Sequence, residues 1–457
     1  MRVTPMSATP ELAAQRLVES LLAQIPDADI VARVEHTEDA LTRFADSAIH
    51  QNHAEDAWTA MVTAHVSGRT LSLSAGLSRA DDGGSLDALA ARLAASLPLA
   101  PADPRWPGAA GPHAVVSSPP AAGSTPSERA DAIAAFIDGA GGLSTAGYTM
   151  TRRTRRAVAT SAGQIAVGIS HGSMLDGIAR SDGIDGTARG AAHALADLDA
   201  HAAGALAAAK VRAGTDAVEL PPGRYEVILE PAAAANIVST LALYGYNGRA
   251  LLDGSSFVQL GAQQLDHAIT IVDDAPAWGV VVDSEGTPTA RRTFVEEGRS
   301  VAVAHDRRTA GETGQPSTGH AVGLPVPMAI HLGIEPGKGD VAIEPVGPVA
   351  ASTVPLLAGV ERALLISDFW YTRVLDPRQV TMTGLTRNGV WLVENGEIVR
   401  PVQNVRFTQS YPGALAPGQV LGVGAVAVTA PDSWNPTAVA TPALHLASWN
   451  VTGNASG

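Results

Sequence analysis

Cysteine is absent from the 457-residue sequence. The chain therefore forms no disulfide, offers no thiolate to a metal ion and has no cysteine nucleophile. Long apolar runs are also absent, since no segment reaches the roughly 18 residues that a membrane-spanning helix needs. Residues 1–26 lack the charged segment and pure apolar core of a signal peptide. We expect a cytoplasmic protein with no membrane partner.

Positive charge is in short supply. The chain has 31 Lys and Arg against 45 Asp and Glu, a formal net charge of -14. Nucleic-acid binding needs clustered basic residues to neutralise phosphates, so no nucleic-acid partner is expected. The exception is the cluster Arg152, Arg153, Arg155 and Arg156, which we interpret as a solvated strand edge.

Aromatic residues are also few, at 4%, whereas glycine (46) and proline (30) are frequent. This composition indicates many turns and much β-structure, and the length exceeds that of one ordinary core. We predict an α+β protein with two domains. Residues 1–215 form an amino-terminal α/β layer domain with antiparallel strands, and residues 216–457 form a β-rich, barrel-like or sandwich domain. The turn Leu220-Pro221-Pro222-Gly223 marks the boundary.

Helices and strands alternate in the first half. Apolar periodicity and capping residues predict helices from Pro10 (N-cap Thr9, with Leu12 among the buried positions), over 85–97 (N-cap Ser85), over 125–139 (N-cap Thr125) and over 187–213. Short apolar runs with polar breaks predict strands over 30–35, 40–44, 47–51, 58–67, 70–75, 144–151, 157–161 and 165–170.

The second half is organised around one buried helix. It begins near Pro231, runs through an Ala-rich apolar segment after a strand over 225–229, and ends near Gly245. The residues after it read as short strands, with Asn388-Gly389 and Asn395-Gly396 as turns. The predicted strands are 269–272, 280–283, 293–296, 300–304, 326–332, 362–368, 381–385, 390–393, 398–402, 405–407 and 425–428.

One motif indicates a serine hydrolase. Residues Gly168 to Gly172 fit G-x-S-x-G, the nucleophile elbow that would expose Ser170, and they follow an apolar strand. An elbow leads into a helix, whereas residues 173–182 contain an internal glycine and read as a strand or loop. A self-sufficient serine hydrolase that uses Ser170 is therefore kept as an alternative.

Several histidines and acids are candidates for a metal or proton-handling site. His193 and His201 fall on one face of the predicted helix over 187–213, and His50 and His53 lie three apart on a strand, which points them to opposite faces. Partly exposed, unligated histidines are the simpler interpretation of both pairs. His305, His320 and His331 lie on separate predicted strands and could converge as a three-histidine site. Asp266-His267 and Asp273-Asp274 could form a proton-handling cluster, or could simply end a loop and cap a strand.

Five segments carry a resemblance to a known family. They are ITIVDDAP (269–276), RTFVEEGRSVAVAHDRRTA (292–310), STGHA (317–321), ENGEIVRPVQNVRF (394–407) and, in the first half, LTRFADSAIHQNHAE (41–55). In their order along the chain, these segments resemble the TldD/PmbA family. The resemblance implies two kinds of subunit with one fold: TldD-like chains, whose His-Glu-x-x-x-His helix and a later cysteine hold a metal, and TldE-like (PmbA-like) chains that lack these residues.

When the helix after Pro231 is aligned with the metal-binding helix of the family, Ala242 and Leu243 stand where the first histidine and the glutamate would be. No histidine in the chain is followed by glutamate, and the cysteine is missing. The resemblance therefore implies a TldE-like subunit with no catalytic residue, metal ligand or cofactor of its own. Zinc is expected in a TldD-like partner, with which it would form a heterodimeric peptidase for extended or unfolded peptides.

Two points stay open. Tyr244, Tyr246, Asn247 and Arg249 follow the organising helix, and they either line a peptide channel shared with the partner or pack around the helix end. The heterodimer would act either in general peptide hydrolysis or in the maturation of a peptide natural product.

Overall fold

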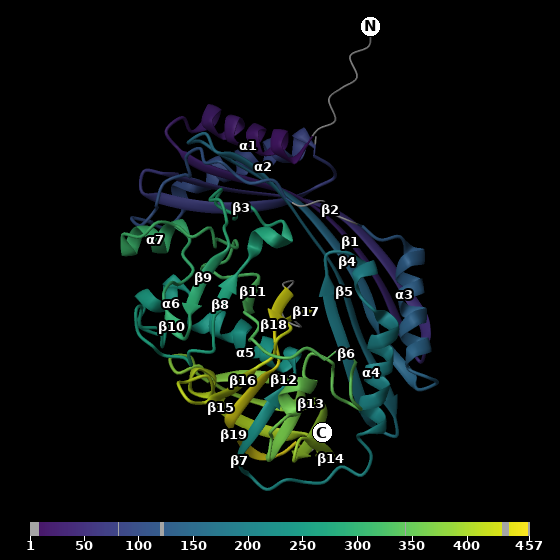
Figure 1. Ribbon diagram of the computed structural model, residues 1–457. Coiled ribbons are helices and arrows are strands. Elements are labelled where there is room, and N and C mark those ends of the chain that lie inside the picture. The colour runs from purple at the N-terminus through teal and green to yellow at the C-terminus, as the bar shows by residue number, and fades with distance from the viewer. Residues whose placement is uncertain (1–8, 81, 119–122, 343, 432–437, 456–457) are drawn as a thin grey trace.

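A computed structural model describes residues 9–80, 82–118, 123–342, 344–431 and 438–455 (Figure 1). The amino-terminal part is built on a six-stranded antiparallel sheet with the strand order β3-β2-β1-β4-β5-β6. Its strands are β1 (Asp29–Ala45), β2 (Ala48–Val66), β3 (Arg69–Leu77), β4 (Ser144–Thr160), β5 (Ile165–Ser181) and β6 (Ile184–Ala192).

Two pairs of helices pack on this sheet. Helices α1 (Pro10–Gln24) and α2 (Gly83–Ser96) cover one end, where Ile30, Ala32 and Val34 of β1 are buried beneath them. Helices α3 (Pro126–Gly139) and α4 (Ala200–Arg212) cover the other end, where Phe136 packs on Phe44. Figure 1 shows both pairs on the outer side of the sheet, whose other face turns toward the carboxy-terminal part.

The carboxy-terminal part contains a closed five-stranded barrel. Strands pair in the order β12-β7-β19-β15-β13, and β13 pairs back with β12. The α+β class and the barrel-like carboxy-terminal region are therefore confirmed. The barrel strands are β7 (Gly223–Leu229), β12 (Arg362–Asp376), β13 (Thr381–Glu394), β15 (Val405–Ser410) and β19 (Leu444–Asn454), with β14 (Glu397–Pro401) and β16 (Val420–Val423) attached.

A second sheet lies beside the barrel. Its strands follow the order β10-β9-β8-β11-β18-β17: β8 (Ile271–Asp273), β9 (Arg292–Glu296), β10 (Arg299–Ser300), β11 (Leu332–Ile334), β17 (Val428–Pro431) and β18 (Ala438–Thr441). Helix α5 (Pro231–Tyr244) contacts both β12 of the barrel and β18 and β11 of this sheet. It is the predicted organising helix, and its apolar residues join one core with both sheets. The short helices are α6 (Gly248–Leu252), α7 (Arg307–Thr313) and α8 (Tyr411–Ala414).

The predicted strand breaks in the first half are wrong. Strands β1 and β2 run through residues 36–39 and 52–57, and β4 runs through 152–156. The polar residues there are paired across strands, with Arg153 on Glu38 at 2.6 Å and Arg152 on Asp39 at 2.6 Å. The arginine cluster is therefore not a strand edge, because β4 lies between β1 and β5.

The predicted helix over 187–213 begins too early, and only its second half is helical. Residues up to Ala192 form β6, and helix α4 starts only at Ala200. Small residues let strand and helix approach closely, since a Cβ on Gly186 would lie 2.1 Å from the Ala207 carbonyl oxygen. An alanine-rich strand followed by an alanine-rich helix has the composition of one long helix, which explains the error.

Smaller differences concern caps and turns. Asp82, not Ser85, caps α2, and Leu12 of α1 is exposed. Asn388-Gly389 lies inside β13 at a bulge, where a Cβ on Gly389 would meet the Trp391 ring. The Asn395-Gly396 hairpin between β13 and β14 is confirmed. None of the helices in the described part of the chain combines the length and apolarity that crossing a bilayer requires.

Candidate functional site

The accessible side of α5 forms the floor of a groove of about 300 Å³. The helix presents Ala232, Asn236, Ser239 and Leu243, which recur at the three- and four-residue spacing of one helix face. The opposite side is buried in the core. Strands β6, β12, β13 and β17 supply the walls, with Arg189, Asp368, Phe369, Trp370, Thr372, Arg373, Val374, Met382, Ala430 and Pro431.

The polar groups of the α5 groove are held by one another. Arg189 of β6 donates to Asp368 of β12 at 3.0 Å, which joins the two parts of the chain. Burial raises the pKa of the Asp368 carboxyl, and Arg189 opposes that rise. The Asn236 amide donates to Thr372 at 3.3 Å and accepts from the Tyr411 hydroxyl at 2.7 Å. Sequence reasoning missed the Arg189–Asp368 pair, because its members lie 179 positions apart on strands of different sheets.

The α5 groove does not fit a catalytic metal ion. Peptidase zinc sites use histidine, carboxylate or thiolate ligands with one position open to water. Among the described lining residues the only carboxylate is Asp368, which Arg189 engages, and α5 contributes no histidine or acid. Of the two positions predicted to replace the first histidine and the glutamate, Ala242 faces the core and Leu243 faces the groove.

The structure spreads the four predicted channel residues over different environments. Tyr244 lines the α5 groove. Tyr246 is fully buried against Phe257, and its hydroxyl lies 3.1 Å from Ser300. Asn247 is buried as the N-cap of α6, and Arg249 pairs with Asp253 and Glu312. A channel role remains a prediction, and Tyr244 is the member with groove-facing surface.

His320 belongs to a buried hydrogen-bond network with Asp273. Its Nε2 lies 2.9 Å from Asp273 Oδ2 and its Nδ1 lies 2.8 Å from the Thr318 hydroxyl, so both ring nitrogens are engaged. Asp273 also accepts from the backbone N–H groups of Ile330 and His331. The His305 ring bonds Thr309 instead. The predicted three-histidine site is therefore not assembled, since His320 has no nitrogen left for a metal.

The remaining candidates lie apart. Exposed side chains of His50 and His53 lie on β2, and His193 follows β6 whereas His201 is on α4, so the two do not share a helix. Asp266 accepts from the backbone of Ala268 and Gly418, as a loop carboxylate does. Asp274 caps a short 3-10 turn.

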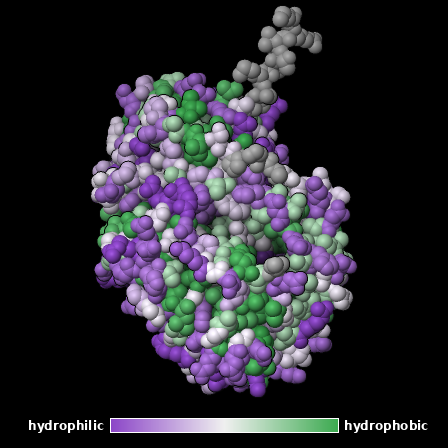
Figure 2. All heavy atoms as spheres, viewed as in Figure 1, coloured by the Kyte–Doolittle hydropathy of each residue, from purple (hydrophilic) through white to green (hydrophobic). Residues whose placement is uncertain are grey.

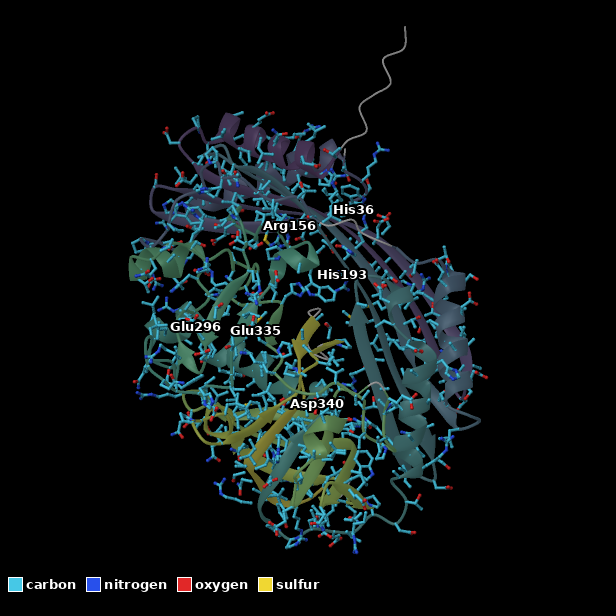
Figure 3. The ribbon with its side chains drawn as sticks, in the orientation of Figure 1. His36, Arg156, His193, Glu296, Glu335 and Asp340 are labelled. Atoms are coloured by element: carbon cyan, nitrogen blue, oxygen red, sulfur yellow. The ribbon has the colours of Figure 1, made fainter. Side chains whose placement is uncertain are left out.

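One acidic group with a histidine was missed by sequence reasoning. His36, Glu38 and Asp56 bring potential ligand atoms within 4.8 Å of one another. Of the three, His36 is labelled in Figure 3. Each is already partnered, with Glu38 held by Arg153 and His36 bonded to Asp56 at 2.8 Å. The cluster reads as cross-strand pairing, which the register of β1 and β2 brings together.

Ser170 lies inside an uninterrupted strand. Strand β5 continues to Ser181, so no strand-to-helix turn follows the G-x-S-x-G motif. A nucleophile elbow requires that turn to expose its serine above the sheet. The strand geometry therefore gives no support to the serine hydrolase alternative.

Comparison with known proteins gives the following matches. The profile of the PmbA/TldA metallopeptidase C-terminal domain matches residues 222–453, just over half of the chain. No curated protein sequence matches. The fold is similar to that of TldE from Thermococcus kodakarensis, with a TM-score of 0.83 and 17% identity over 96% of this chain and 100% of that one.

Two further solved structures share the fold. A putative modulator of DNA gyrase from Thermotoga maritima has a TM-score of 0.80 and 16% identity, covering 97% of this chain and 100% of its own. A putative modulator of DNA gyrase from Bacteroides thetaiotaomicron has a TM-score of 0.77 and 18% identity, covering 97% and 99%. These likenesses extend over nearly the whole chain and establish its architecture.

Proposed function

Because the chain belongs to the PmbA/TldD metallopeptidase family, we propose that it is a TldE-like subunit that acts with a separate, metal-bearing TldD-like chain in hydrolysing extended peptides. The observation that carries this proposal is the composition of α5. None of the α5 residues that line the groove is a histidine, a carboxylate or a cysteine, the strong ligands of a catalytic metal: they are Ala232, Ala235, Asn236, Ser239, Thr240, Leu243 and Tyr244. The partner would contribute zinc and the water-activating glutamate.

The α5 groove suits a supporting role in peptide binding. It combines apolar surface from α5 and β12 with a fixed Arg189–Asp368 pair, and Tyr244 lies at its margin. Such a groove holds an extended segment through packing and a few polar contacts, without performing chemistry on it. We assign Tyr244 to the peptide channel in this proposal.

The proposal is tested by reconstitution. The chain alone, supplied with zinc, is expected to leave a fluorogenic unstructured peptide intact, whereas mixing it with a TldD-like partner that carries His-Glu-x-x-x-His yields chelator-sensitive cleavage. The Ser170→Ala chain should support the partner as well as the natural chain does. Chelator-resistant cleavage by the chain alone, with a fluorophosphonate label on Ser170, would refute the proposal.

A further inference from the structure

A second cavity, of about 480 Å³, lies between the sheet and the loops around β8 and β11. Its volume is within the range of roughly 300–1,000 Å³ that is usual for small-molecule pockets. Figure 2 shows the surface hollowed near the middle of this face, where the sheet meets the carboxy-terminal part. It is separate from the α5 groove, with which it has no lining residue in common.

The sheet side of this cavity is polar. Glu35 and Thr37 of β1 lie opposite Arg156 and Thr154 of β4 in the strand register, so all four share one face of the sheet. The hydroxyls of Thr37 and Thr154 are 3.2 Å apart. Arg156 is labelled in Figure 3, on the part of the sheet nearest the carboxy-terminal part.

One carboxylate of this floor, that of Glu35, is shared by two guanidinium groups. One oxygen of Glu35 receives the Arg156 guanidinium at 2.5 Å and faces that of Arg33 at 3.6 Å, so one carboxylate serves two cations. Burial would raise the pKa of Glu35, but Arg156 and Arg33 hold it below its ordinary value, and Glu35 is ionised. Asp283, the other acid near Arg33, accepts from the backbone of Glu285, Thr287 and Ala321 instead.

The opposite side of the cavity is apolar. It is formed by Trp278, Val280, Val322, Leu324, Met328 and Ile330. The Trp278 ring contacts two imidazole rings. Its centroid lies 4.4 Å from that of His193 and 5.5 Å from that of His331, whose ring is nearly parallel to it. The apolar residues come from two connections, one between β8 and β9 and one between α7 and β11, and together they form a wall for an apolar group.

His331 adds a hydrogen-bonding atom to this wall. Burial lowers the pKa of its imidazole, which is therefore neutral near pH 7, and the ring is also bonded to the backbone of Ala438. Its Nδ1 is buried and has no hydrogen-bond partner in the described structure. Leaving a buried polar atom unpaired is unfavourable, so a ligand N–H directed at this nitrogen would be stabilising.

We propose that this cavity binds an apolar N-acylated amino acid through its carboxylate, the chemistry shared by a free N-acyl amino acid and by the carboxyl-terminal residue of a short peptide. The carboxylate pairs with Arg156, the side chain packs against Trp278 and Met328, and the amide N–H donates to His331. The site goes beyond the proposed function, because binding needs neither the partner nor a metal.

Titration calorimetry of the chain with N-acetyl-L-phenylalanine tests the site. The acid is expected to bind at least about tenfold more tightly than its carboxamide, because a charge-assisted contact is lost in the amide. Met328→Trp, which fills the cavity without changing its charge, should abolish binding, and Arg156→Gln should weaken it by about tenfold. Arg180→Gln is the matched control, because Arg180 lies outside the cavity, on an exposed part of β5, and pairs with Asp185 of β6. The Arg180→Gln variant should bind the acid as the natural chain does.

A second arm distinguishes the sources of the ligand. If the carboxyl-terminal ends of peptides are the natural ligand, the tripeptide Gly-Gly-Phe with a free carboxylate binds more tightly than the N-acetyl amino acid. If free N-acyl amino acids are the natural ligand, the tripeptide binds more weakly. Either order supports the site. Equal affinity for acid and amide, normal binding by Met328→Trp, or no binding by the natural chain would overturn it.

Discussion

Glu230→Ala is expected to lower the free energy of unfolding by about 3–5 kcal/mol, because it leaves the buried Lys210 ammonium without its partner. Glu230 immediately precedes α5, and both members of the pair are 4% exposed. The carboxylate accepts from Lys210 at 2.5 Å, from the Ser367 hydroxyl at 2.9 Å and from the backbone of Ala350 at 3.2 Å. It therefore fixes the start of α5 against α4 of the amino-terminal part.

Chemical unfolding of matched variants measures this effect. Glu226→Ala, on the preceding strand β7, removes a partly exposed carboxylate that pairs with His445, and should lower stability by only about 1 kcal/mol or less. The double variant Lys210→Met, Glu230→Leu should recover most of the loss, since a buried pair replaced by apolar groups is often neutral. Equal losses in the free energy of unfolding for Glu230→Ala and Glu226→Ala would contradict the stabilising role given to the buried Lys210–Glu230 pair.

Asp273→Asn is expected to lower the free energy of unfolding near pH 7 by about 3–5 kcal/mol, because it breaks the buried pair with His320. Burial alone would raise the pKa of Asp273, but the hydrogen bond and charge of His320, with the backbone N–H of Ile330, lower it. A carboxyl whose folded pKa is depressed stabilises the fold above its unfolded pKa of about 3.9, and this contribution is lost as the pH falls.

The difference between Asp273→Asn and the natural chain should therefore shrink as the pH falls below about 4. Asp274→Asn is the control, since Asp274 is partly exposed and asparagine also serves as an N-cap. It should change stability by about 1 kcal/mol or less at any of these pH values. A pH-independent difference for Asp273→Asn would show that the lost interaction does not depend on the charge of Asp273.

Local signals in the sequence predicted those elements whose formation depends on neighbouring residues. Helix α5 was predicted from Pro231 and an apolar period, and α3 from Thr125 as its N-cap. The structure adds a capping box to α3, in which Thr125 and Glu128 bond each other's backbone. The Asn395-Gly396 hairpin needs only left-handed residues at its turn. The α+β class and the barrel-like second half follow from the same signals.

The errors arose where distant residues determine local structure. Glu38 and Asp39 looked like a break in β1, but arginines more than a hundred positions later neutralise them within the sheet. The Asp273–His320 network and the Arg189–Asp368 pair also join residues that only the tertiary fold brings together. The lack of histidine and acidic residues on α5, in contrast, can be seen in the sequence itself, because it depends only on which residue types the helix contains.

Zinc retention by the purified chain tests the central claim most directly. After incubation with excess zinc and dialysis against metal-free buffer, elemental analysis should find no more zinc in the chain than in a buffer control, because the residues around α5 supply no adequate ligand set. A variant with Ser239→His and Leu243→His, which places two ligands one turn apart on the groove face, should retain measurably more. One equivalent of zinc held at nanomolar affinity by the natural chain would contradict the account.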